Sequence, residues 1–322
     1  MTAVYITIDT EYSAGLAVRL GLGARQEVFD RSITCKTPMG DVGIVHQMAV
    51  MDAHQIKGVF FVDPMPALIW GVRAIADVIE PILERGHEVQ LHLHPEWLEI
   101  AGDANPLRGR TGRAMHDFTE QEQVELIEIA REYLVQAGAP APTAFRAGNY
   151  AADDATLRAL LRCGIRYDSS HVPGLPSSDC RISLGQKDRQ VVEHHGTIEV
   201  PTGSINALRG QRHAQVTAVS NWEMRAALRH AVAQGIPMLN LVSHSFELMS
   251  RDRKLANPFL VRRFTQLCRD IARIDGAHSA TFRSRPPRLG EETGAARMPV
   301  SEVRTGLRIA EQALSNAIYG RS

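Results

Sequence analysis

Three short polar clusters, each directly after an apolar run, hold the residues of this sequence that could do chemistry. They are Asp9-Thr10-Glu11, His92-Leu93-His94-Pro95-Glu96 and His244-Ser245-Phe246-Glu247. The apolar runs have strand character, and where parallel strands alternate with helices, the C-terminal strand ends meet on one rim. Carboxylates and imidazoles gathered on one rim indicate a hydrolytic metal site.

Asp9 and Glu11 lie two positions apart, so on a strand both carboxylates can point to the same side. Two carboxylates this close repel each other, which raises one pKa unless a cation lies beside them. A divalent metal held by one carboxylate removes the repulsion and leaves the other free to act as a base. Taken alone, an acidic pair at a strand end is more often solvated or caps a turn.

His92 and His94 also share a face, and Glu96 lies four residues beyond His92. Two imidazoles and a carboxylate are the ligand set of a catalytic zinc or a similar divalent ion, with one position left for water. A lone histidine after a strand is usually only hydrogen-bonded. Two histidines and a carboxylate within five residues, together with Asp9 and Glu11, favour a metal site.

His244 follows the last predicted strand, and Glu247 is close enough in the sequence to orient it. It could act as a general acid that protonates a leaving group, which requires a pKa near the working pH; the alternative is a surface turn histidine. Arg146 ends a further short strand and could pair with Asp9 and keep it ionised. Its alternative is an ordinary surface salt bridge.

The rest of the sequence predicts alternating strands and helices. Strands are expected at 3–9, 57–62, 87–92, 143–146, 165–168 and 238–243, and helices at 41–55, 66–85, 119–137, 153–163, 220–234 and 258–273, with a long loop after the first strand. This alternation implies parallel strands joined by crossover helices. Periodicity alone does not separate a barrel from an open sheet, but a closed or nearly closed barrel brings the three clusters together.

The chain is expected to divide at residue 283. Residues 1–283 form the α/β unit, and residues 284–322 are predicted as a linker followed by an amphipathic helix at 300–318. This helix packs back on the body or against another subunit, so a homo-oligomer formed through it is one expectation. His194-His195 lies in a polar turn and is expected to face solvent.

Composition narrows the class of protein and its partners. The 322 residues are 44% hydrophobic and 22% charged, with a formal net charge of zero, which argues against nucleic acid or an anionic membrane as the main partner. The N-terminus lacks a signal-peptide pattern, and no apolar stretch reaches the ~20 residues that span a bilayer. The four cysteines are scattered, so structural zinc and a disulfide framework are not expected. A cytoplasmic protein without membrane insertion is predicted.

Read in order, the clusters resemble the motifs of the polysaccharide deacetylase family, metal-dependent carbohydrate esterases that remove N-acetyl groups from sugars. The likeness runs roughly from residue 3 to residue 250 and implies a distorted (β/α) barrel with about seven parallel strands. The first motif is similar to 7–11, the second strand to 58–62, the approach to the histidine motif to 86–92, the arginine motif to 145–150 and the closing histidine motif to 241–245.

The resemblance implies a role for each residue. Asp9 is the base, Glu11 a metal ligand, Arg146 the residue that holds the base, and His244 the catalytic acid. The family's adjacent aspartates are here Asp9 and Glu11, with Thr10 between them. The family's second metal histidine comes four residues after the first, where this sequence has Glu96; either His94 supplies the missing nitrogen or Glu96 ligates through oxygen. Zinc is the expected metal, with cobalt or nickel as alternatives.

The implied function is removal of an N-acetyl (acyl) group from a sugar or glycan precursor, with water attacking the amide. Without a signal peptide, an activated or lipid-linked acetamido sugar is expected as substrate rather than mature wall polymer. One alternative is a hydrolase of a non-sugar C–N amide bond, such as a cyclic ureide, with or without metal. The other is a catalytically silent glycan-binding protein on the same barrel, suggested by the altered ligand set at Glu96.

Overall fold

The computed structural model describes residues 1–208 and 210–320. The strands are β1 (Thr2–Thr10), β2 (Val59–Val62), β3 (Glu88–Leu93), β4 (Ala144–Ala147), β5 (Tyr167–Asp168), β6 (Val192–His194), β7 (Thr197–Glu199), β8 (Ser204–Asn206), β9 (Gln211–His213), β10 (Met238–His244) and β11 (Ala277–Ser279). The α-helices are α1 (Ala14–Leu20), α2 (Arg25–Ser32), α3 (Ile44–Asp52), α4 (Ala67–Trp70), α5 (Val72–Glu84), α6 (Trp97–Ala101), α7 (Glu120–Gln136), α8 (Asp154–Arg162), α9 (Asn221–Ala233), α10 (Pro258–Arg273) and α11 (Glu302–Tyr319). Short 3-10 helices are η1 (Leu22–Ala24), η2 (Gly102–Ala104), η3 (Met115–Asp117) and η4 (Gly148–Tyr150).

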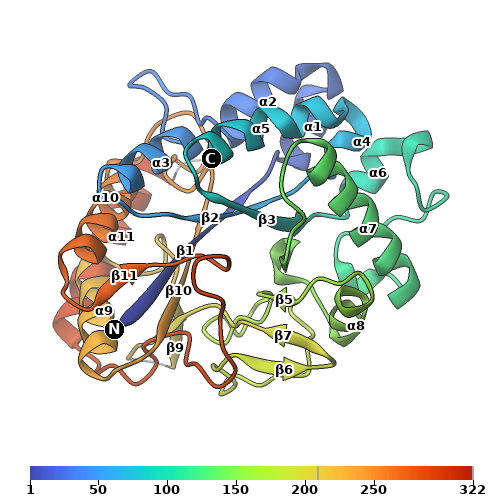
Figure 1. Ribbon diagram of the computed structural model, residues 1–322. Helices are drawn as coiled ribbons and strands as arrows, with labels where there is room; N and C mark the ends of the chain where they lie inside the picture. Colours follow the sequence, from blue (N-terminus) through green and yellow to red (C-terminus); the bar gives the residue numbers. More distant parts are fainter. Residues whose placement is uncertain (209, 321–322) are drawn as a thin grey trace.

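The main sheet is a distorted barrel surrounded by helices (Figure 1). Its strands pair in parallel in the order β10-β1-β2-β3-β4-β5-β7, with β6 added antiparallel to β7 and β11 beside the start of β1. The chain after β7 reaches back to β10, where the Gly203 N–H donates to the Asn240 carbonyl at 2.7 Å. The predicted fold, a distorted (β/α) barrel with about seven parallel strands, is confirmed.

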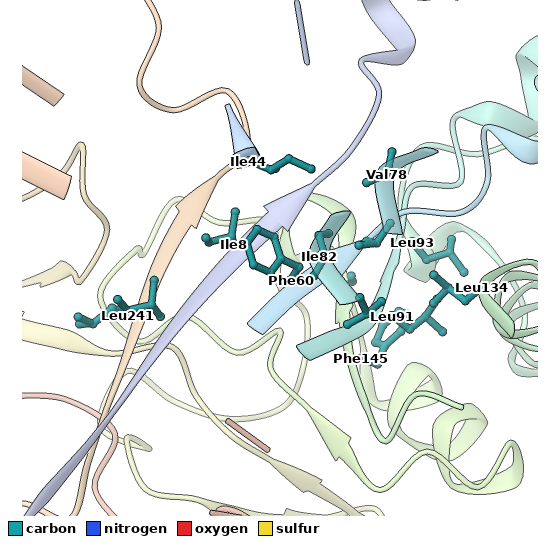
Figure 2. Close-up of a cluster of buried hydrophobic side chains, with 14 of the residues drawn as sticks. Ile8, Ile44, Phe60, Val78, Ile82, Leu91, Leu93, Leu134, Phe145 and Leu241 are labelled. Atoms are coloured by element: carbon teal, nitrogen blue, oxygen red, sulfur yellow. The ribbon is translucent and has the colours of Figure 1, made fainter. Parts of the chain in front are cut away.

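Strand side chains alternate between the helices outside the barrel and the barrel interior, which is why the parallel strands read as continuous apolar runs. Figure 2 shows part of the outer core, where Ile8, Phe60, Leu91, Phe145 and Leu241 from five strands pack with Ile44 of α3, Val78 and Ile82 of α5 and Leu134 of α7. A second cluster inside the barrel contains Tyr5, Phe61, Tyr167 and Phe282. Asp9 has the same parity on β1 as Tyr5, so its side chain also points inward.

Local signals placed several helices correctly. The helices expected at 119–137 and 220–234 are α7 and α9, and capping boxes open both: the Thr119 and Ser220 side chains accept hydrogen bonds from the backbone N–H groups of Glu122 and Glu223. The single helix predicted at 66–85 is wrong, because Gly71 at φ +73° separates α4 from α5.

The long loop predicted after β1 is also wrong, because residues 14–32 form α1, η1 and α2. The Ser13 hydroxyl caps α1 by accepting a hydrogen bond from the Leu16 N–H. A capping serine before so short a helix is a weak sequence signal.

The segment predicted as a linker lies against the barrel rather than free in solvent. Ala295 and Met298 are buried in the main core, and the Asn240 N–H donates to the Thr293 carbonyl at 2.9 Å. Helix α11 packs back on its own chain, where Arg263 pairs with Glu311 at 2.9 Å. A boundary at residue 283 and subunit contact through α11 stay predictions. No helix in the described part of the chain is long and apolar enough to cross a membrane.

Candidate metal and catalytic site

Three side chains at the C-terminal rim of the barrel converge on one point. Glu11 follows β1, and His92 and His94 lie at and just beyond the end of β3. Glu11 Oε2 lies 3.1 Å from His92 Nε2 and 2.5 Å from His94 Nε2, and the two Nε2 atoms are 3.1 Å apart. Ligands of a tetrahedral ion with bonds of ~2.1 Å lie about 3.4 Å apart. The three groups could therefore hold one metal ion.

Hydrogen bonds on the far side of each imidazole support this assignment. His92 Nδ1 lies 2.7 Å from the Arg146 carbonyl oxygen, and His94 Nδ1 lies 3.2 Å from Glu96 Oε2. Because both partners accept, Nδ1 is the donor nitrogen of each ring, and Nε2 is the nitrogen that faces Glu11. A histidine whose other nitrogen donates to a carbonyl or carboxylate is the usual arrangement of a metal ligand. The donor set fits a divalent ion.

The Glu11 carboxylate supplies the negative charge that suits a cation. Burial raises the pKa of Glu11, but His94 and His92 outweigh burial and hold the pKa well below its ordinary value. Burial lowers the pKa of His94, but Glu11 and Glu96 outweigh it and raise the pKa well above its ordinary value. The Glu11 carboxylate is therefore ionised, and Glu96 stands behind His94 rather than among the three converging atoms.

Asp9 and Arg146 form a buried ion pair beside this cluster. Arg146 is fully buried, and its Nη1 donates to Asp9 Oδ1 at 2.6 Å, while its Nη2 donates to Thr7 Oγ1 and its Nε to the Ser169 carbonyl, both at 3.0 Å. The guanidinium also lies 4.4 Å from the centre of the Phe61 ring. Burial raises the pKa of Asp9, but Arg146 and the two nearby histidines outweigh it and lower the pKa. Asp9 is therefore held ionised in a fixed orientation.

His244 faces Asp9 from the adjacent strand, because β1 and β10 pair Asp9 with His244. His244 Nε2 lies 3.9 Å from Asp9 Oδ2, and its Nδ1 lies 3.1 Å from Glu247 Oε2. Glu247 is itself fixed by the Thr217 N–H, which donates to Oε1 at 2.8 Å. Burial lowers the pKa of His244, but Glu247 and Asp9 outweigh it and raise the pKa to about 9. The imidazole is therefore protonated at neutral pH.

A glycine makes room for the three candidate metal ligands, Glu11, His92 and His94. A Cβ on Gly148 would lie 2.7 Å from His94 Nδ1, closer than real Cβ atoms approach another atom, so only glycine fits against this ring. The next two residues, Asn149 and Tyr150, have φ of +53° and +57° and line a cavity of about 360 Å³ that also contains the carboxylates and imidazoles. Backbone strain of this kind collects at functional sites.

Asp63 is a rim residue that the sequence reasoning missed. It directly follows β2, and its Oδ1 accepts from the Met65 N–H at 3.1 Å and the His94 N–H at 3.4 Å, while its buried Oδ2 has no partner among the described residues. Burial raises the pKa of Asp63 to about 7. The rule applied to the other strands, a polar residue just after an apolar run, would have found it.

His195 is exposed, as predicted for this turn, and His194 is partly buried. Their rings lie 4.4 Å apart at the β6–β7 turn, and His195 Nε2 lies 3.2 Å from Asp154 Oδ2. These three residues form a second group that could hold a metal ion, with side chains between 22% and 35% exposed. None of them lines the cavity at the barrel rim.

Known proteins resemble this chain in structure rather than in sequence. No family model and no curated protein matches it. A Mycobacterium smegmatis protein described as a polysaccharide deacetylase superposes with a TM-score of 0.53 at 14% identity, covering 91% of this chain and 93% of the other. The 4-alpha-glucanotransferase of Thermococcus litoralis superposes with a TM-score of 0.51 at 10% identity, covering 91% of this chain but 41% of the other. A family 4 carbohydrate esterase from Streptomyces lividans, in complex with acetate, superposes with a TM-score of 0.44 at 9% identity, covering 90% of this chain and 98% of the other.

These likenesses define the class of fold. The chain has the fold of the polysaccharide deacetylases, as its motifs predicted. The glucanotransferase shares the fold across most of this chain, so the fold alone does not decide the reaction. Function must be argued from the groups at the rim.

Proposed function

We propose that the protein is a metal-dependent hydrolase that removes an N-acetyl (acyl) group from a sugar or glycan precursor. One observation carries this proposal: three side chains that could hold a metal ion, an ionised carboxylate and a protonated imidazole face one cavity of about 360 Å³. Water attack on an amide needs an electrophile for the carbonyl, a base for the water and an acid for the departing amine. The rim offers a group for each.

Glu11, His92 and His94 would hold the ion, and Glu96 would fix the His94 ring through Nδ1. When bound, a divalent ion polarises the amide carbonyl and lowers the pKa of water toward about 7. Two nitrogens and one carboxylate oxygen suit zinc, with cobalt or nickel as alternatives. We therefore propose His94 rather than Glu96 as the third ligand, because His94 Nε2 converges with Glu11 and His92.

The remaining steps belong to the protein's own side chains. Asp9, kept ionised by Arg146, accepts a proton as water attacks the carbonyl carbon. His244, oriented by Glu247 through Nδ1, donates the Nε2 proton to the amine as the C–N bond breaks. One amide and one water give acetate and a free amine, so atoms and protons balance.

The substrate class is also part of the proposal. The proposed substrate is an acetamido sugar or glycan precursor, and the proposed location is the cytoplasm. The same groups would also hydrolyse a non-sugar amide such as a cyclic ureide, because none of them is specific to sugars. A catalytically silent glycan-binding protein would need neither the ion nor the acid and base.

The test measures metal content and acetate release together on the purified full-length protein. We expect close to one zinc, cobalt or nickel ion per chain at the rim and acetate release from at least one acetamido sugar. A cyclic ureide is tested beside the acetamido sugars. Metal content is also measured in the His195→Gln variant, which removes the group of Asp154, His194 and His195 as a source of bound metal. A metal-free protein that binds glycans without releasing acetate would refute the proposal, and ureide hydrolysis alone would change the substrate class.

A further inference from the structure

A second cavity adjoins the site, and His244 lines both cavities. Its volume is about 520 Å³, larger than that of the cavity at the metal cluster. Its walls come from the loop after β10 and from α11, including Phe246, Arg251, Arg253, Asn316 and Tyr319. A substrate whose amide reaches His244 can therefore extend into this space, which we call the α11 cavity.

Arg253 brings a positive charge into the α11 cavity. Its Cζ lies 3.8 Å from the centre of the Phe246 ring, and its Nη1 donates to Ser32 Oγ at 3.2 Å. Within residues 1–208 and 210–320, no acidic side chain forms an ion pair with it, and the neighbouring Asp252 pairs with Lys254 instead. Burial lowers the pKa of Arg253, and Glu11 offsets only part of this effect. A partly buried cation that no acidic side chain of the described residues pairs is costly, which favours an anionic ligand.

The backbone at Arg253 is strained. Arg253 has φ of +56°, in the left-handed region that residues other than glycine rarely adopt. The ring of Phe246, on which the guanidinium stacks, lies 5.4 Å from the ring of His244, centre to centre. The strained residue therefore places its charge one side chain away from the proposed catalytic acid.

We propose that the substrate is an acetamido sugar that carries an anionic group, a phosphate or a carboxylate, which Arg253 binds while the amide lies at His244. This inference rests on the proposed deacetylase function and adds the charge of the substrate. A guanidinium binds either anion through two parallel N–H···O bonds, and in residues 1–208 and 210–320 the Ser32 hydroxyl accepts from only one of the five N–H donors of Arg253. Arg251, exposed on the same wall, adds positive charge.

The experiment compares charged and neutral substrates on the metal-loaded protein. Acetate release is measured for N-acetylglucosamine 1-phosphate, UDP-N-acetylglucosamine, N-acetylmuramic acid and the neutral methyl glycoside of N-acetylglucosamine. We expect at least one anion to be preferred over the neutral sugar in kcat/KM, and the ratio to fall about 10- to 100-fold in Arg253→Met. The phosphate and carboxylate arms identify the anion.

Two controls keep the result interpretable. Arg269→Met removes an exposed arginine of α10 that does not line the α11 cavity, and it should keep the wild-type ratio. Arg253→Lys keeps the charge and should restore part of the preference, and urea unfolding checks that Arg253→Met is folded.

Binding of the same compounds, measured by calorimetry, distinguishes a failure of the anion site from a failure of the proposed deacetylase function. If acetate is released but wild type and Arg253→Met show the same anion-to-neutral ratio, the anion site is wrong and the deacetylase stands. If no compound releases acetate but the anions bind wild type at least 10-fold more tightly than Arg253→Met, the site stands and the deacetylase is wrong. Equal binding without acetate release overturns both.

Discussion

Metal affinity should follow a definite order among the rim variants, because the structure separates three converging atoms from one supporting carboxylate. Glu11, His92 and His94 supply the converging atoms, whereas Glu96 contacts only the far nitrogen of His94 at 3.2 Å. Four-ligand structural zinc sites bind with about 10–16 kcal/mol, or about 2.5–4 kcal/mol per ligand. Losing one ligand should weaken binding by about 10² to 10³-fold.

Removing a supporting carboxylate should cost less, about 10- to 100-fold. The expected order of zinc affinity is therefore wild type, then Glu96→Gln, then the Glu11→Gln, His92→Gln and His94→Gln variants together. The assay is competition against a chromophoric chelator, with His195→Gln as the background in every protein so that only the rim group is titrated. Glu99→Gln is the matched control, because Glu99 is an exposed residue of α6 three positions from Glu96.

Two results would contradict the reasoning. Near-normal affinity in His94→Gln with a large loss in Glu96→Gln would make Glu96 the third ligand. Unchanged affinity in Glu11→Gln, His92→Gln and His94→Gln would show that these residues hold no metal, and the proposed hydrolysis would lose its electrophile.

Three further predictions concern the base, the acid and the glycine. Asp9→Asn should keep its zinc but lower kcat for acetate release by about 10² to 10⁴-fold, and an active variant would refute the assigned base. Gly148→Ala should weaken zinc binding by about 10-fold in the same chelator assay, because its Cβ would lie 2.7 Å from His94 Nδ1. Since the pKa of His244 is raised to about 9, kcat should fall as the pH rises above about 9 and the acid loses its proton. In Glu247→Gln the fall of kcat should begin at a lower pH. If it begins at the same pH as in wild type, the pairing of Glu247 with His244 is contradicted.

The sequence predicted which side chains gather at the rim better than it predicted the helices around them. Asp9, Glu11, His92 and His244 come together because each lies at the C-terminal end of a parallel strand, and that rule needs only local strand patterns and alternation. His94 and Glu96 could not be separated from the sequence. Which of them meets Glu11 depends on the direction of the His94 ring, and Gly148, 54 positions further along the chain, leaves the space that this ring occupies.

What the sequence did not predict depends on contacts between distant segments. The short helices α1 and α2 are stabilised by packing on the barrel rather than by strong periodicity, and isolated helices of this length are marginal. Residues 284–300 look like a linker because they are rich in Gly, Pro and Arg, yet Thr293 accepts a backbone hydrogen bond from Asn240 of β10. No local signal encodes that pairing. The α11 cavity beside His244 depends on it, since α11 follows this segment.

One short segment connects the two halves of the proposed mechanism. In 145–150, the Arg146 side chain holds Asp9, while its carbonyl accepts from His92 Nδ1 and thereby turns Nε2 toward the metal position. Gly148 then gives His94 the space to turn the same way. The base and the metal cluster therefore share one backbone support. A disturbance of β4 should impair proton transfer and metal binding together, whereas Asp9→Asn impairs only the first. Measuring both properties in the same variants would separate a loss of chemistry from a loss of this support.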